Sequence, residues 1–155
     1  MLIKNNGVSL IALVFTIIVI LMLASVFIST SLRSLEETRK SEIQNEINAI
    51  ETAAAMRYSS YLKNSNDEIL VGVSPSSTSK VNNATNCINV INEYAELNEN
   101  EKEMIKNHFD SYIKIITKDV ANELGVGQFK NDSIYIVDYC TSSAYGPISK
   151  QDIGM

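Results

Sequence analysis

The first third of the chain carries two successive hydrophobic patterns, and the first is continuous. Residues 8–28 contain no charged side chain, and fifteen of these 21 are Leu, Ile, Val or Phe. These side chains favour insertion into a bilayer by roughly 5 to 9 kcal/mol. As a helix the segment is about 31 Å long, close to the hydrocarbon thickness of a membrane. The pattern predicts a membrane-spanning helix over residues 8–30.

The second pattern is amphipathic and predicts that the same helix continues over residues 31–63. No Gly or Pro occurs between Gly7 and Gly72 to stop it. Apolar side chains recur mainly at three- and four-residue steps, as expected for one face of a helix. This stripe consists of Leu32, Leu35, Ile43, Ile47, Ile50, Ala54, Tyr58 and Tyr61. We expect the stripe to contact a globular head formed by residues 64–155 of the same chain.

The head is predicted to contain short helices. One begins at Thr85 or Asn86 and runs to residue 96. Asn98 followed by Glu101 resembles a capping box and opens a second helix. A third is stopped by Gly125.

Strands are predicted at three further places in the head. Residues 69–73 are apolar and β-prone, residues 133–139 alternate, and residues 144–148 can return beside them. Residues 112–116 fit either a helix end or a strand. The fold class is therefore α+β, with a long N-terminal helix packed on a small head that has a short antiparallel sheet.

Length and net charge limit the number of domains and the kinds of partner that the chain can have. The chain has 155 residues, which fits one domain plus an anchor, and 13 basic against 18 acidic residues give a net charge of -5. Nucleic acid is not an expected partner, because a phosphate-binding surface needs clustered Lys and Arg.

The residues around the start of the apolar helix form a motif. A basic residue lies upstream of a Gly, an apolar residue follows the Gly, and the helix begins at once; the run is Lys4-Asn5-Asn6-Gly7-Val8-Ser9-Leu10-Ile11. This segment resembles the leader and first helix of type IV prepilins and pseudopilins. The resemblance covers about 25 residues, and beyond them it is one of architecture.

The resemblance implies processing and assembly. Residues 1–7 would be a leader removed after Gly7 by a membrane-embedded prepilin peptidase, and Val8 would become the methylated N-terminus. Other pilin-like subunits would bind through the N-terminal helix, in a surface filament or in a secretion or DNA-uptake pseudopilus. The sequence departs from the family at Ala12, where most members carry Glu. In the family this carboxylate is thought to pair with the N-terminal amine of a neighbouring subunit during assembly. Ala12 cannot form that pair, which suits a minor subunit with no neighbour ahead of it in the filament.

Two other interpretations of the N-terminus stay open. An ordinary signal peptide has an apolar region of about 7 to 15 residues, shorter than the one here. A plain uncleaved anchor would present the head as a membrane-anchored binding module that never polymerises. In each anchored case Lys4 favours an N-terminus inside the cell and a head outside it. The apolar helix is the part of the chain that would contact membrane lipid.

Candidate chemistry is sparse. His108 is the single histidine, and no nucleophile or orienting carboxylate can be placed beside it from the sequence. A half-buried structural role is therefore expected. The spacing of His, Cys and acidic residues fits no metal site, and Gly125-Val126-Gly127 lacks the pattern of a phosphate loop. We predict no catalytic residues, no metal and no cofactor.

The two cysteines, Cys87 and Cys140, fall on the side expected to be outside the cell. Oxidation is possible there, so a disulfide between them is predicted. Two buried thiols are the alternative interpretation.

Overall fold

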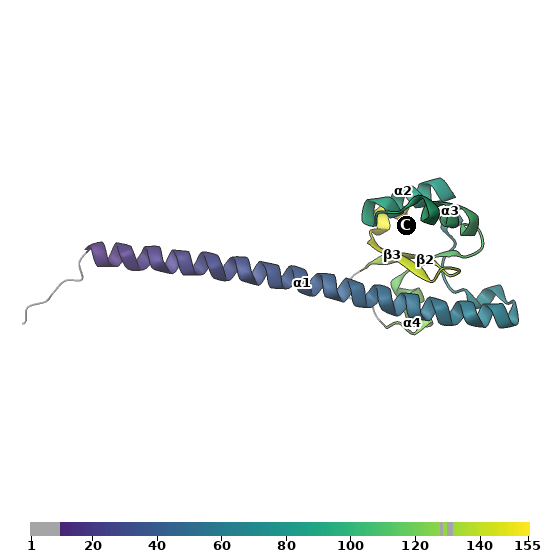
Figure 1. The fold of residues 1–155 in the computed structure, drawn as a ribbon, viewed down its shortest axis with the longest axis horizontal. Helices are drawn as coiled ribbons and strands as arrows, with labels where there is room; N and C mark the ends of the chain where they lie inside the picture. Colours follow the sequence, from purple (N-terminus) through teal and green to yellow (C-terminus); the bar gives the residue numbers. More distant parts are fainter. Residues whose placement is uncertain (1–9, 128, 130–131) are drawn as a thin grey trace, which may run out of the picture. The chain divides into compact units, whose positions relative to one another are not determined.

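The structure is a computed structural model that describes residues 10–127, 129 and 132–155 (Figure 1). It begins with helix α1 (Leu10–Asn64), which confirms the long helix. The chain divides into two compact units, the first ending at Glu42 and the second formed by Ile43–Met155. The second part of α1 therefore belongs to the unit that contains the head.

In the first unit, α1 exposes its side chains from Leu10 to Ser41. The described residues contain one helix long and apolar enough to cross a membrane, with a mean hydropathy of 3.1 in its most apolar window. The four hydroxyl groups between Leu10 and Thr30 need no outside partner, because each donates to a backbone carbonyl three or four residues earlier. They belong to Thr16, Ser25, Ser29 and Thr30.

The second unit is built on a three-stranded antiparallel sheet in the order β1-β2-β3. The strands are β1 (Ile113–Ile116), β2 (Ile134–Asp138) and β3 (Ser143–Ile148). Ile115 lies opposite Ile136, and Val137 lies opposite Ala144. The α+β class is thus correct, and residues 113–116 form a strand.

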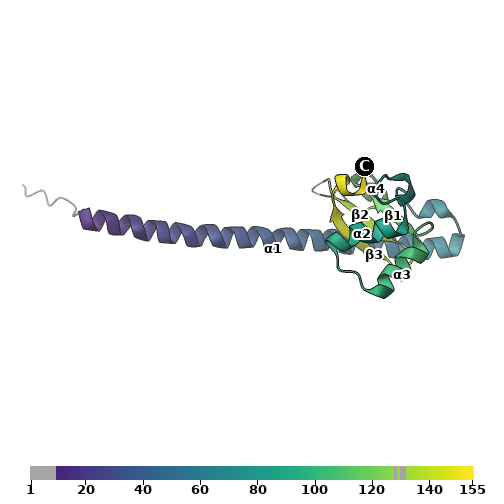
Figure 2. The same cartoon turned by 90° about the horizontal axis from the view of Figure 1, so that it is seen from above.

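Helices cover both faces of this sheet, as Figures 1 and 2 show. On one face lie α2 (Ala84–Tyr94), α3 (Glu99–His108) and the short α5 (Lys150–Ile153). Their apolar side chains form one core cluster with the strands; its members include Ile88, Ile91, Ile105, Ile115, Ile136 and Ile153.

The other face is covered by the end of α1 and by α4 (Lys118–Leu124). Ile50 and Ala54 of α1 are completely buried there, in a second cluster with Tyr135, Val137 and Tyr139. The strand predicted over residues 133–139 is confirmed by β2, but its alternation marks no solvent face, since every residue of β2 is buried. The reason is that a central strand covered on both faces has no solvent side.

The helix termini follow the predicted capping chemistry with small shifts. Asn98 and Glu101 form a full capping box at the start of α3, and Gly125 ends α4 in the left-handed conformation. The cap of α2 is Asn83 rather than Thr85 or Asn86, because its side chain accepts the amide of Asn86. That helix ends at Tyr94, two residues before the predicted end.

The strand predicted at residues 69–73 is not present. The segment begins with a single helical turn, Asp67–Ile69, and only Val73 pairs with a strand, through one bridge to Ile115. Gly72 explains the break. Its φ is +145°, a conformation outside the strand region, and a Cβ atom there would lie 2.6 Å from the Cβ of Lys114, so only Gly fits and the strand conformation is interrupted.

Candidate functional site

The apolar part of α1 is the largest exposed apolar surface among the described residues. Leu10, Ile11 and Phe15 are 77%, 78% and 67% exposed, and large apolar side chains remain uncovered as far as Leu35. Soluble monomers rarely expose a continuous apolar surface of this extent, and the segment is long and apolar enough to cross a membrane.

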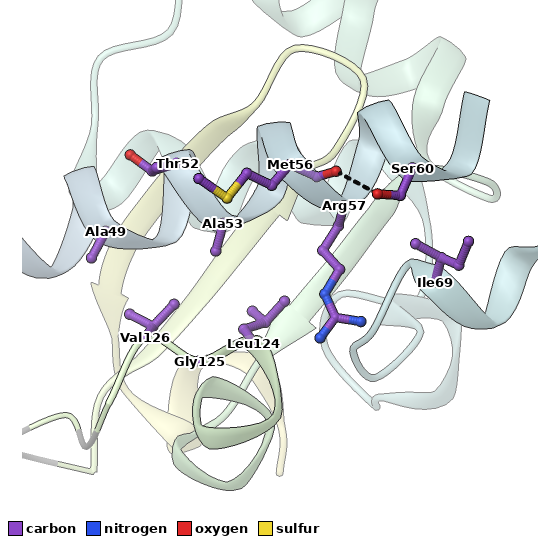
Figure 3. A pocket seen from close by; sticks show the side chains of 10 residues that line it. All are labelled: Ala49, Thr52, Ala53, Met56, Arg57, Ser60, Ile69, Leu124, Gly125 and Val126. Atoms are coloured by element: carbon purple, nitrogen blue, oxygen red, sulfur yellow. Dashed lines mark hydrogen bonds between the residues drawn. The ribbon is translucent and has the colours of Figure 1, made fainter. Parts of the chain in front are cut away.

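A groove of about 690 Å³ lies in the second unit, between α1 and the end of α4 (Figure 3). One wall is the α1 surface from Ala49 to Ser60, and the other contains Leu124, Gly125 and Val126. The wall on α1 is made of short side chains except Met56 and Arg57, and Met56 is 66% exposed. Short side chains on a helix let another helix approach closely.

Arg57 sets the polarity at one end of this groove. Its side chain descends from α1 between Leu124 and Ile69 in Figure 3. Its Nη2 donates a hydrogen bond of 2.8 Å to the backbone carbonyl of Glu123. The guanidinium is half-buried and keeps further donors for another acceptor, since five N–H groups are available and one is used in this bond.

A second site links α3 to the sheet through His108. Its Nδ1 lies 2.7 Å from Oδ2 of Asp138, whose side chain is 1% exposed. The other carboxylate oxygen of Asp138 accepts the backbone amide of Cys140 at 2.9 Å. Asp138 is the orienting carboxylate that the sequence did not locate. The sequence did contain a signal for it: Asp138 is an acidic residue in an apolar strand, and an acidic side chain that is buried requires a polar partner.

Three tyrosines form a ring cluster next to this pair. Tyr58 and Tyr61 of α1 stack, and each meets Tyr112 edge to face, at centroid distances of 5.8 to 6.0 Å. Tyr112 also contacts the His108 ring edge to face. The Tyr58 hydroxyl donates to Cys140 Sγ at 3.4 Å, and this bond together with partial burial raises the pKa of Tyr58 to about 12.

The arrangement around His108 is that of a packed interior. The imidazole bonds to the carboxylate and packs against the Tyr112 ring, so both have partners within the fold. The His108–Asp138 bond links α3 to β2. This matches the expected half-buried, structural His108. Loss of His108 would leave the buried Asp138 side chain without this hydrogen-bond partner, which typically costs about 1 to 3 kcal/mol.

Cys87 and Cys140 are free thiols in the structure, so the predicted disulfide is not formed. Cys87 is fully buried in the core cluster of α2, where burial raises the pKa of its thiol to about 12. Cys140 follows β2 and is half-buried against α1. The α2 cluster and the α1 cluster lie on opposite faces of the sheet, which explains why the thiols do not meet.

Two glutamates of α1 bind the sheet directly. Glu46 accepts the hydroxyl of Tyr135 at 2.5 Å, and Glu51 accepts the backbone amide of Ala144 at 3.2 Å. Burial, and then the Glu46 carboxylate, raise the pKa of Tyr135 above its ordinary value. These bonds fix the register of α1 on the sheet.

The predicted processing residues Gly7 and Val8 lie outside the described residues. Within the part of the chain that the structure describes, no three His, Cys, Asp or Glu side chains gather as metal ligands. Comparison of the chain with family models, curated proteins and solved structures finds no match.

Proposed function

We propose that the chain is a structural subunit of the type IV pilin-like or pseudopilin class. Before assembly it is held in the cytoplasmic membrane by its N-terminal helix, where a prepilin peptidase cuts it after Gly7 and Val8 is methylated. It then enters a surface filament or a secretion or DNA-uptake pseudopilus. It acts by packing rather than by catalysis.

The observation that carries this proposal is the change of partner along a single helix. Apolar side chains of α1 are exposed as far as Leu35, whereas Ile50 and Ala54 of the same helix are fully buried against the sheet. One helix therefore offers an apolar surface to lipid or neighbouring helices and also forms part of the head core. A subunit that moves from a membrane into a helical filament needs both properties.

Mass spectrometry of the intact protein from its own membranes tests the processing step. The expected mass is that of residues 8–155 with one added methyl group. Gly7→Val should leave the full-length mass, because a branched side chain at the cleaved position hinders entry of the bond into the peptidase cleft, where Gly has no side chain to obstruct it. Asn5→Ala is the matched control and should be processed normally. Retention of residues 1–7 beside an active peptidase would refute the pilin assignment.

The alternative function is an anchored binding module that does not polymerise. The three half-exposed tyrosines beside His108 favour it, since tyrosine is enriched in binding surfaces. Sheared cell-surface material distinguishes the two functions. A filament subunit is released by shear in polymeric form, whereas an uncleaved anchor stays with the membrane.

A further inference from the structure

Two features of the molecule have no partner in the fold described above. The first is the groove between α1 and α4, with its wall of short side chains and Arg57 at one end. The second is the surface of α1 that contains Leu32 and Leu35, each 62% exposed. The second feature precedes the part of α1 that packs on the head.

The groove has the dimensions and chemistry of a helix-binding site. Ala49 and Ser60 are about 16 Å apart along α1, at 1.5 Å per residue. This length accommodates two turns of another helix lying beside it. Ala49 and Ala53 permit close approach, and Met56 is a flexible apolar contact that adapts its shape to a partner.

Residues 32–39 of α1 present a matching surface. Leu35 and Glu36 are three and four positions after Leu32, so these three side chains are neighbours on the helix. Arg39 lies one turn further on the same face. The surface is therefore an apolar pair followed by an acidic and then a basic side chain, over about 10 Å.

The charges of the two features are complementary. The groove ends in Arg57, and the next charged residue beside it is the exposed Glu123, whose carbonyl holds the guanidinium. Glu36 of an incoming helix can pair with Arg57 while Arg39 approaches Glu123. Glu36 already pairs with Lys40, but both side chains are about two-thirds exposed or more. Such a surface pair contributes little to stability and is easily exchanged.

We propose that the groove of one subunit binds residues 32–39 of α1 from a second copy of this chain. The proposal rests on the assembly function above and adds the contact surface to it. Leu32 and Leu35 enter the groove against Ala53 and Met56, and Glu36 pairs with Arg57. The contact is heterologous, so it leaves a free groove and a free helix surface at the two ends and can propagate along a filament.

Cysteine cross-linking between two differently tagged full-length chains in the same cells tests the contact. Both chains carry Cys140→Ser, one carries Leu35→Cys and the other Met56→Cys. Mild oxidation should yield a disulfide-linked dimer of the two tags. Ser34→Cys, on the opposite side of the helix from the proposed surface, replaces Leu35→Cys in the control. We expect at least a fivefold lower yield from the control pair.

Charge reversal gives an independent measurement. Glu36→Arg, an exposed change, should lower the cross-linking yield several-fold, and a further Arg57→Glu should restore it. Tyrosine fluorescence of each variant during unfolding checks that the head is intact. Failure of the second change to restore the yield in a folded variant would overturn the charge pairing.

The outcomes separate this inference from the proposed function. If chains are processed and found in filaments but Leu35→Cys cross-links no better than Ser34→Cys, the groove contact is wrong and the filament function stands. Cross-linking of Met56→Cys only to a protein of different mass also overturns the second-copy assignment. Cross-linking of chains that keep residues 1–7 would support the contact while refuting the pilin assignment.

Discussion

Replacing Ile50 with Ala should destabilise the head strongly, because this residue of α1 is part of the head core. Its side chain is 0% exposed and belongs to the cluster on the α1 face of the sheet. The change removes three buried carbon atoms without adding a polar group. At about 0.8 kcal/mol per buried carbon, the transfer term alone is about 2.4 kcal/mol.

The cavity left behind adds to this cost. Ala54, one turn further along the same helix, is too small to fill the space, and Tyr135 and Tyr139 are held by hydrogen bonds to Glu46 and the Val71 carbonyl. Partial relaxation is therefore expected, and the total loss should be about 3 to 4 kcal/mol, within the range seen for such changes. That is a large fraction of a typical stability of about 5 to 15 kcal/mol.

Denaturant unfolding of the full chain in detergent measures the effect. The protein has seven Tyr and no Trp, and all seven Tyr lie in the second unit. Tyrosine fluorescence therefore reports on the unfolding of the head. Leu62→Ala is the matched control on the same helix, because Leu62 is 64% exposed and should cost less than about 0.5 kcal/mol. Equal midpoints for the two variants would refute the assignment of α1 to the core.

Three further results are expected. Asn98→Ala should cost about 0.5 to 2 kcal/mol in denaturant unfolding, because the capping box of α3 is lost, and an unchanged midpoint would contradict this. Alkylation of the native protein should modify Cys140 well before Cys87, and equal rates would contradict the burial of Cys87. Burial raises the pKa of Tyr139 from 10.0 to about 12, so its contribution to stability is complete below pH 10 and is lost as the pH rises toward 12. Thermal unfolding between pH 9 and pH 12 should show that decline, and a Tyr139→Phe variant should show less of it.

The local signals in the sequence were sufficient wherever a residue acts on its own neighbours. Asn98 and Glu101 form their capping box, and Gly125 ends its helix, because these bonds join groups within four residues of one another. The continuous helix over residues 10–64 follows from uninterrupted helix-forming residues in the same way.

Features that depend on distant partners were not accessible from the pattern. The residues of β2 alternate in polarity, yet both sides are buried, because α1 approaches from more than 80 residues away and covers Tyr135. Asp138 could not be assigned to His108 for the same reason, since 30 residues separate them. The groove is likewise formed by two segments whose contact no periodicity predicts.

The division of α1 between two units explains why the head needs the helix. The sheet has three strands and two buried faces, and α2 and α3 supply cover for only one of them. Without residues 43–64, only α4 and its neighbouring loop would cover Ile116, Tyr135 and Val137, and burying such apolar area is the main source of folding free energy. A head fragment therefore has to begin before Ile43 rather than after Asn64. In the full chain, the helix that completes the core of the head is the same helix that continues into the apolar segment.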